Sequence, residues 1–347
     1  SADVSADATR LSNEFGTEMA ILKGRVDGLE YKVQELSAGQ FSPSTKMMGQ
    51  AVFTTGFVDV NGTTVDDNKL TSQYNFMLMM HTSFTGEDHL HISLDQGNQA
   101  DPMKMDSAMD MVMSSVTVSS LYYQFPVGDF QVTAGPKLDQ DDVVSATTSI
   151  YSDAFRLASM PYGLQGNKKG PGGAISWAND NGFNASFSAI ASHSSMIAGG
   201  ANASKGMFTK ETADFITASI GYDDEKYGVG LIYTDDDTDT SLGGGIYFRP
   251  DGFPTISISY DKKDVTASGS PDTSEFMVGF DYEVGPGTAS AAYLSADDGT
   301  NTLGKYEVYY NYPVNDGVSV QGGFFTEEQA GSTADTTGYV VETFFSF

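Results

Sequence analysis

Hydrophobic and polar residues alternate with a period of two along most of the chain after residue 46. In one segment Phe276, Val278, Phe280 and Tyr282 share an apolar face, whereas Asp281 lies on the opposite face. This alternation is typical of β-strands, and most of these segments have about 9–12 residues, enough for a tilted strand to cross a bilayer. Sixteen strands are predicted, over residues 47–60, 70–85, 88–96, 113–126, 128–138, 170–178, 182–192, 212–222, 226–235, 240–249, 253–262, 273–284, 286–297, 303–313, 316–326 and 336–347.

The connections between these segments alternate between short turns and longer loops. Turn sequences such as Pro250-Asp251-Gly252 are short, whereas the connection 139–169 is the longest. A soluble sandwich would also contain many strands, but it gives no reason for alternating loop lengths. The pattern predicts an all-β fold, a 16-stranded antiparallel transmembrane β-barrel with its turns on the periplasmic rim and its loops outside. An even strand number places both barrel ends on the periplasmic side.

The last predicted strand is apolar and aromatic on one face up to the final residue. That face contains Tyr339, Val341, Thr343, Phe345 and Phe347. A closed barrel needs a last strand that pairs with the first and faces lipid. We therefore expect Phe347, Phe345 and Tyr339 to face outer-membrane lipids and to form the assembly signal that barrel-assembly machinery reads.

Residues 8–37 follow a different period, with apolar residues spaced alternately by four and three. These residues are Phe15, Met19, Leu22, Val26, Leu29, Val33 and Leu36. The spacing predicts a coiled-coil helix that associates with copies of itself, and the alternative is a single amphipathic helix packed on its own domain. We expect a periplasmic coiled-coil helix over residues 1–38, a linker over 39–46 and the barrel over 47–347.

Composition excludes several classes of function. The 347 residues include 46 acidic and 18 basic side chains, a net charge of −28 that argues against nucleic-acid binding. There is no cysteine, no apolar run long enough for a membrane helix, and no nucleophile or phosphate-loop motif, so we expect no enzyme and no resident cofactor. Many acids fall in turn-like clusters, which favours solvated loops over the alternative of divalent-cation sites.

The positions opposite the apolar stripes are expected to line the lumen. Acids outnumber bases there, so a narrow pore would favour cations. The predicted lining residues are Lys137, Arg249, Asp261, Asp281, Glu283, Lys305, Glu307 and Glu342.

The connection 139–169 combines charged residues with apolar residues that a free loop does not need. Structureless loops of this length are uncommon unless they are functional, and an unobstructed 16-stranded barrel leaves a wide channel. We expect the loop to fold inward as a constriction, and the alternative is an external flap. Its charged residues are Asp139, Asp141, Asp142, Asp153, Arg156, Lys168 and Lys169.

Two further groups of residues are considered as candidates for metal binding. His81, His89 and His91 are expected on the lumen face, with His81 diagonal to His91, either as ordinary polar residues or as a weak metal site. The methionine-rich tract from Met103 to Met113 is expected to be a flexible loop packed on a neighbouring subunit, with soft-metal binding as the alternative.

The stretch Leu22-Lys23-Gly24-Arg25-Val26-Asp27-Gly28-Leu29-Glu30, followed by Gln40-Phe41-Ser42 and Ser44-Thr45-Lys46, resembles the cyanobacterial outer-membrane porins of the S-layer-homology type. The resemblance implies a homotrimer and passive passage of inorganic ions and small solutes, and some members are described as iron-uptake porins. It also implies a cell-wall-binding domain before the coiled coil, which is absent or removed here. The alternative to a porin is a structural anchor with a nearly closed barrel that links the outer membrane to the cell wall.

Overall fold

A computed structural model describes residues 23, 25, 44–60, 69–107, 115–151, 155–157, 168–191, 207–209, 213–331 and 335–347. Ser1–Met47 and Met48–Phe347 form two compact units. The predicted coiled-coil residues from Phe15 to Leu36 lie outside the described residues. Nearby, Lys23 and Arg25 are described and are helical. Within the described ranges, no helix combines the length and apolar character needed to span a membrane.

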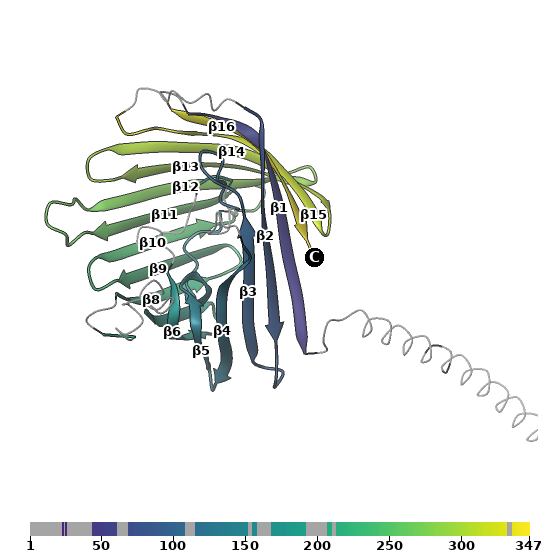
Figure 1. The fold of residues 1–347 in the computed structure, drawn as a ribbon, viewed down its shortest axis with the longest axis vertical. Coiled ribbons are helices and arrows are strands. Elements are labelled where there is room, and N and C mark those ends of the chain that lie inside the picture. The colour runs from purple at the N-terminus through teal and green to yellow at the C-terminus, as the bar shows by residue number, and fades with distance from the viewer. Residues whose placement is uncertain are drawn as a thin grey trace, which may run out of the picture. The chain divides into compact units, whose positions relative to one another are not determined.

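The strands that the structure describes form a closed barrel of sixteen strands in chain order (Figure 1). All sixteen predicted strands are present, and their ends lie at most four residues from the predicted positions, the largest difference being the fourth strand, which begins at Thr117 instead of residue 113. The strands are β1 (Thr45–Val60), β2 (Thr71–Thr82), β3 (His89–Gly97), β4 (Thr117–Val127), β5 (Phe130–Asp139), β6 (Lys169–Ala178), β7 (Phe183–Ala191), β8 (Asp214–Asp223), β9 (Tyr227–Asp235), β10 (Thr240–Phe248), β11 (Thr255–Asp264), β12 (Thr273–Val284), β13 (Gly287–Asp297), β14 (Thr302–Asn315), β15 (Val318–Glu327) and β16 (Thr336–Ser346). A short 3₁₀ helix, η1 (Asp141–Val143), follows β5.

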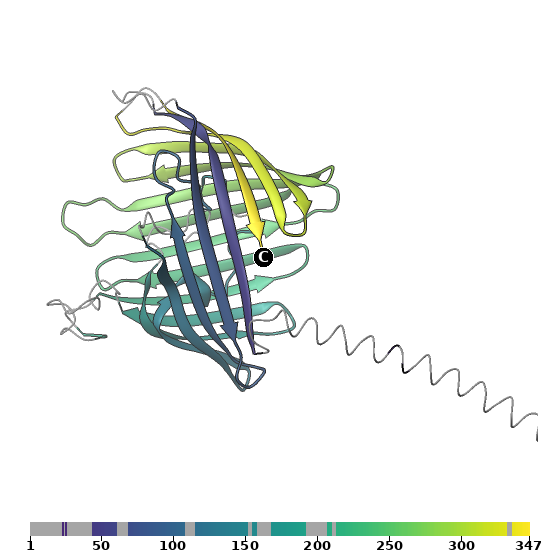
Figure 2. The same cartoon turned by 45° about the vertical axis from the view of Figure 1, so that its right-hand side comes forward.

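The last strand closes the barrel against the first. β16 is antiparallel to β1, with a register that runs from Gln50 opposite Ser346 to Val60 opposite Thr336 (Figure 2). The final residue continues this pairing, because Gly49 N donates to Phe347 O at 2.7 Å and Phe347 N donates to Gly49 O at 3.0 Å. Phe347 is therefore part of the hydrogen-bonded seam.

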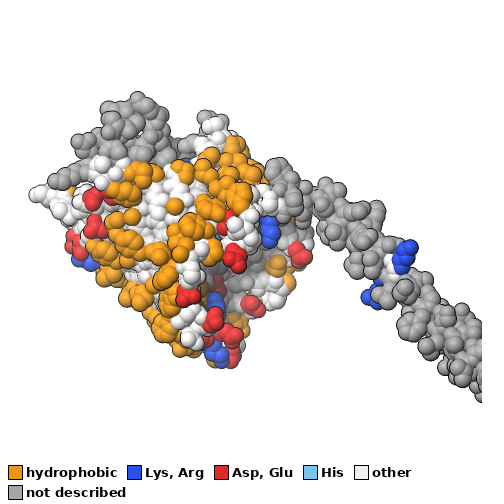
Figure 3. Space-filling view, turned by 90° about the horizontal axis from the view of Figure 1, so that it is seen from below, with side chains coloured by type: hydrophobic (Ala, Val, Ile, Leu, Met, Phe, Trp, Pro, Cys, Tyr) orange, Lys and Arg blue, Asp and Glu red, His pale blue; other side chains and the backbone are white. Residues whose placement is uncertain are grey.

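The outer face of the barrel is apolar. Tyr339, Val341 and Phe347 are exposed on β16, whereas Val340 and Glu342 between them are buried. Figure 3 shows hydrophobic side chains spread over the barrel surface, with acidic side chains grouped near its edges. The aromatic rings pair across the seam, with 5.1 Å between the ring centroids of Phe53 and Phe345. Exposed apolar side chains alternating with buried polar ones match the lipid-facing band of an outer-membrane barrel.

Turns join one end of the strands, and the connections at the other end are mostly longer, as the sequence predicts, although 236–239 and 298–301 are as short as a turn. Gly128 and Gly285 sit in two of the short turns with φ of 62° and 64°, a conformation that side chains disfavour. In the turn before β3, the Asp88 carboxylate accepts hydrogen bonds from the backbone N–H groups of Phe84 and Thr85. The hydroxyl of Tyr123 also donates to Asp88 and is the main reason why the pKa of this carboxyl lies far below its usual range.

Candidate functional site

The interior of the barrel holds a cavity of about 760 Å³. Its walls come from the inner faces of β2–β6 on one side and β12–β15 on the other, with η1 and residues 101–106 and 156–157 between them. Eight acidic and four basic side chains line it. The acids are Asp95, Asp101, Asp106, Asp139, Asp141, Asp142, Glu275 and Glu327, and the bases are Lys104, Arg156, Lys169 and Lys305.

The segment after β5, residues 140–151 and 155–157, runs along the inner wall, and we call it the long inward loop. Gln140 Nε2 donates to Thr217 Oγ1 of β8 at 2.8 Å, and Ile150 N donates to Ser257 Oγ of β11 at 3.2 Å. Between these points the loop lies against inner-face glycines, because a Cβ at Gly230 would come within 2.7 Å of the Thr147 carbonyl. Small inner-face residues therefore leave a track in which the loop backbone lies directly on the wall.

Glu307 of β14 holds the far end of this loop. Its Oε2 accepts hydrogen bonds from the backbone N–H groups of Arg156 at 2.7 Å and Leu157 at 2.8 Å. Its Oε1 accepts from the Tyr151 hydroxyl at 2.6 Å and from Phe155 N at 3.3 Å. Glu307 is 1% exposed, so four donors compensate for the removal of its charge from water.

The predicted lining carboxylates lie on the inner face but differ in burial and in hydrogen bonding. Glu342 is fully buried and accepts hydrogen bonds from Thr54, Ser107 and Gln321. Asp261 is buried beside Ser241, which donates to it. Three further predicted residues, Asp281, Glu283 and Lys305, retain access to solvent, and Lys305 lines the cavity.

Two predicted lining residues lie elsewhere. The β4–β5 register shifts at a bulge between Leu121 and Tyr123, and Lys137 pairs with Leu121, whose face is opposite to that of the buried, inward-facing Tyr122. The prediction that Lys137 faces the lumen is therefore wrong, because strict alternation fails at a bulge. Arg249 is exposed just after β10, with its guanidinium 5.1 Å from the centre of the Tyr247 ring.

Most charged residues predicted for the constriction gather at the cavity. Asp139, Asp141, Asp142, Arg156 and Lys169 all line it. Lys169 Nζ lies 2.6 Å from Asp139 Oδ2, so the charges of these two residues partly neutralise each other. The Lys168 ammonium instead lies 5.2 Å from the centre of the Phe215 ring, and Asp153 lies outside the described residues.

Asp142 gives the cavity a titratable charge near neutral pH. Partial removal from bulk water inside the barrel, and then the Asp141 carboxylate, raise the pKa of Asp142 to about 6, although its side chain is exposed to the cavity. A hydrogen bond with Tyr122 and the charge of Lys169 act in the opposite direction. The folded protein thus binds this proton more tightly than the unfolded chain does, so stability from this group rises as pH falls through 6.

We expect cation preference to weaken as pH falls from 7 to 5, because Asp142 loses its negative charge over that range. The measurement is the zero-current potential across a planar bilayer at a series of pH values. Asp142→Asn is the control, and it should lower the cation preference at pH 7 and flatten the change near pH 6. An unchanged pH profile in this variant would show that another group carries the titration.

The three predicted histidines lie together on the inner wall. His81 and His91 are directly opposite across β2 and β3, not diagonal as expected, and share a hydrogen bond of 2.7 Å between Nε2 and Nδ1. His91 Nε2 also contacts Ser120 Oγ at 2.9 Å, and the His91 ring stacks on Tyr122. Both ring nitrogens of His91 are thus engaged. Across the described ranges, no group of three or more His, Cys, Asp or Glu side chains is placed to hold a metal ion.

Acids in the loop clusters form local turn contacts. Asp236 Oδ1 accepts from the backbone N–H groups of Thr238 and Asp239, and Asp298 Oδ1 accepts likewise from Thr300 and Asn301. These backbone hydrogen bonds lower the pKa of Asp298.

Residues 98–107, the start of the methionine-rich tract, are the main feature that the sequence reasoning missed. Met103 and Met105 are each 2% exposed and pack inside their own barrel, so the expectation that this part packs on a neighbouring subunit is wrong. Glu275 and Glu327 were also missed, although Glu275 alternates with the exposed aromatic residues of β12, so period-two counting could have found it.

Comparisons with solved structures find the same barrel. An anion-selective porin from Comamonas acidovorans matches with a TM-score of 0.62 at 14% identity, over 88% of this chain and 99% of that one. A variant of the porin from Rh. blastica matches with a TM-score of 0.55 at 14% identity, over 87% of this chain and 100% of that one.

Two cyanobacterial proteins match parts of the sequence. An uncharacterized protein of Nostoc sp. is 44% identical over 95 residues, which is 27% of this chain and 16% of the relative. An uncharacterized protein of Synechocystis sp. is 28% identical over 129 residues, 35% of this chain and 24% of the relative. The chain thus aligns with less than a quarter of the length of each.

The family comparison covers most of the chain. The family model for Gram-negative porins matches residues 24–331. That match, together with the closed sixteen-stranded barrel and its apolar outer face, identifies the chain as a member of the Gram-negative porin family, whose members are non-enzymatic channels of the outer membrane.

Proposed function

We propose that this porin is a passive, cation-leaning diffusion channel for inorganic ions and small solutes, with the connection 139–169 as its constriction. The observation that carries the proposal is the seating of the long inward loop along the inner wall from Gln140 on β8 to Glu307 on β14. A segment held across a barrel interior narrows the passage that sixteen strands would otherwise leave wide.

The sign of the lining charge supports the cation preference. Eight acids and four bases line the cavity, and the Arg156–Glu327 and Lys169–Asp139 pairs offset two of each. The acids exceed the bases by four, and fixed negative charge in a narrow aqueous space concentrates cations. The solved porin described as anion-selective shares 14% identity, so its likeness concerns the fold alone.

A structural anchor with a nearly closed barrel is the second candidate. It is favoured by the apolar cluster of loop and wall residues in the interior, which includes Met103, Met105 and Phe155. Conductance separates the two functions: we expect the purified full chain to give discrete open-channel steps in a planar bilayer and to admit small sugars into proteoliposomes. Bilayers that contain inserted barrels but carry no current would favour the anchor.

The assembly that we propose is a homotrimer in the outer membrane, inserted by barrel-assembly machinery, with the helix of residues 1–38 in the periplasm as a coiled coil. The four-and-three spacing from Phe15 to Leu36 supports self-association of that segment. Chemical crosslinking of the full chain should give a trimer ladder. Replacing Leu29 with aspartate should weaken crosslinks within the helix while the barrel still inserts.

A further inference from the structure

A second segment also lies inside the barrel. Residues 98–107, which we call the second inward loop, are tied to the inner wall by Gln99 Nε2, which donates to Thr54 Oγ1 at 2.6 Å, and by Ser107 Oγ, which donates to Glu342 Oε1 at 2.5 Å. Asn75 Nδ2 donates to the Ser107 carbonyl at 2.6 Å. The loop is thus anchored on β1, β2 and β16, and its hydrogen bonds reach both sides of the closure seam between β1 and β16.

The two inward loops share one apolar cluster. Met103 and Met105 of the second loop are buried with Tyr151, Phe155 and Leu157 of the long loop, against the inner face of β12–β16 and β1. Their backbones also meet, because Asp106 N donates to Phe155 O at 3.2 Å. This apolar cluster fills part of the lumen and borders the aqueous cavity, because Met105, Leu157 and Leu294 belong to both.

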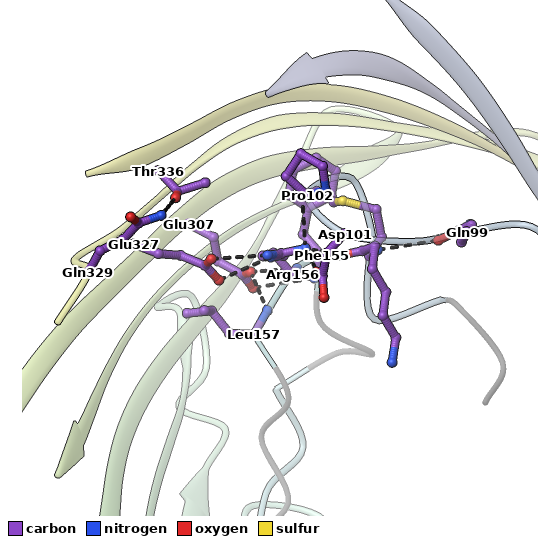
Figure 4. A network of polar contacts seen from close by, with 12 residues as sticks. Gln99, Asp101, Pro102, Phe155, Arg156, Leu157, Glu307, Glu327, Gln329 and Thr336 are labelled. Carbon is purple, nitrogen blue, oxygen red and sulfur yellow. Dashed lines mark hydrogen bonds and ion pairs between the residues drawn. The ribbon is translucent and has the colours of Figure 1, made fainter. Parts of the chain in front are cut away.

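Arg156 contacts both loops and the wall at once (Figure 4). Its Nε and Nη2 donate to Glu327 Oε1 and Oε2 of β15, each at 3.0 Å, in a bidentate pair. Its Nη1 donates to the carbonyl of Pro102 at 3.3 Å and to that of Lys104. The guanidinium also lies 4.9 Å from the centre of the Phe325 ring. The side chains of Arg156 and Glu327 are 12% and 15% exposed, so water screens this pair weakly.

We propose that Arg156 is a positioning residue that locks the second inward loop to the long inward loop and to β15, so that both loops together set the width of the passage. The proposal rests on the proposed function, in which the long loop is the constriction. It adds a second segment to that constriction and names the side chain that joins them. A planar fork suits this task, since a single ammonium cannot hold a bidentate carboxylate and two carbonyls together.

The lock is tested first by chemical accessibility, which does not require a conducting channel. The chain has no cysteine, so Met105→Cys places a single thiol at a buried position of the second loop. We expect this thiol to resist a polar maleimide in the otherwise unchanged protein and to react roughly tenfold faster or more when Arg156→Gln is added, because charged hydrogen bonds that hold the loop are lost. Equal labelling rates in the two proteins would overturn the proposal.

The second test is single-channel recording of the same variants. Arg156→Gln should raise the conductance, admit larger sugars and add current fluctuations as the loops separate. Arg156→Lys keeps the charge but not the fork, so positioning predicts that it resembles Arg156→Gln, whereas a purely electrostatic role predicts wild-type behaviour and would contradict us. Lys226→Gln, which removes an exposed ion pair with Asp251 at a short turn, is the matched control and should change neither readout.

The two tests separate this proposal from the proposed function. If the wild-type protein carries no current but the thiol becomes labelled only when Arg156 is replaced, the lock stands and the channel function fails. If the wild-type protein conducts and the Arg156 variants match it in labelling and in conductance, the channel stands and the lock fails.

Discussion

Replacing Glu307 with alanine is expected to raise the single-channel conductance and the size of the solutes that pass, while the barrel still assembles. Glu307 accepts four hydrogen bonds from the long inward loop and is 1% exposed. Each hydrogen bond to a charged group stabilises by roughly 1.5–3 kcal/mol, so losing even part of this set would release the end of the loop. Planar-bilayer conductance and sugar uptake by proteoliposomes measure the effect.

Two further variants serve as comparisons for this experiment. Glu307→Gln retains one acceptor oxygen and should give an intermediate conductance. Glu283→Ala removes another predicted inner carboxylate, exposed near the end of β12, and should leave the sugar cutoff unchanged. If Glu307→Ala inserts normally but conducts and excludes sugars as the wild type does, the long loop does not set the passage.

Deleting Phe347 is expected to reduce strongly the amount of folded barrel in the membrane. The deletion removes two backbone hydrogen bonds with Gly49 at the closure seam, worth about 1–3 kcal/mol together. It also removes the aromatic ring that occupies the space over Gly49, where a Cβ would collide with it. Heat-modifiable mobility on gels and protease resistance of the full chain measure the folded fraction.

Two substitutions at the same position separate the backbone from the ring. Phe347→Ala keeps the seam hydrogen bonds and should lose assembly through the missing ring alone. Phe347→Tyr keeps both and should assemble as the wild type does. Normal yields of folded barrel for the deletion and for Phe347→Ala would refute the role of the terminal residue.

The barrel could be predicted from the sequence because the pattern that produces it lies within each strand. Each strand must present an apolar face to lipid, so residues such as Phe276 and Tyr306 alternate visibly with polar neighbours. The same alternation placed Glu307 and Glu342 on the inner face. It failed at Lys137, because strict alternation does not hold at a bulge, although the preceding Gly135-Pro136 is a pair of residue types that often mark one.

The roles of the inner residues could not be read in the same way, because their partners are distant in sequence. Glu307 is bound by Arg156 N and Leu157 N, about 150 residues earlier, and Glu342 by Ser107, 235 residues earlier. Both carboxylates were predicted to be charges that line the pore, but each one accepts hydrogen bonds that anchor an inward loop. The methionines of the second inward loop were similarly ambiguous, since a buried loop and a subunit contact call for the same flexible apolar side chains.

The cation preference of the channel is tested by the zero-current potential of the purified full chain in a planar bilayer across a KCl gradient. A lumen lined by eight carboxylates and four basic side chains should pass K⁺ more readily than Cl⁻. We therefore expect the dilute side to become positive. A potential of the opposite sign, which means preference for Cl⁻, would contradict it.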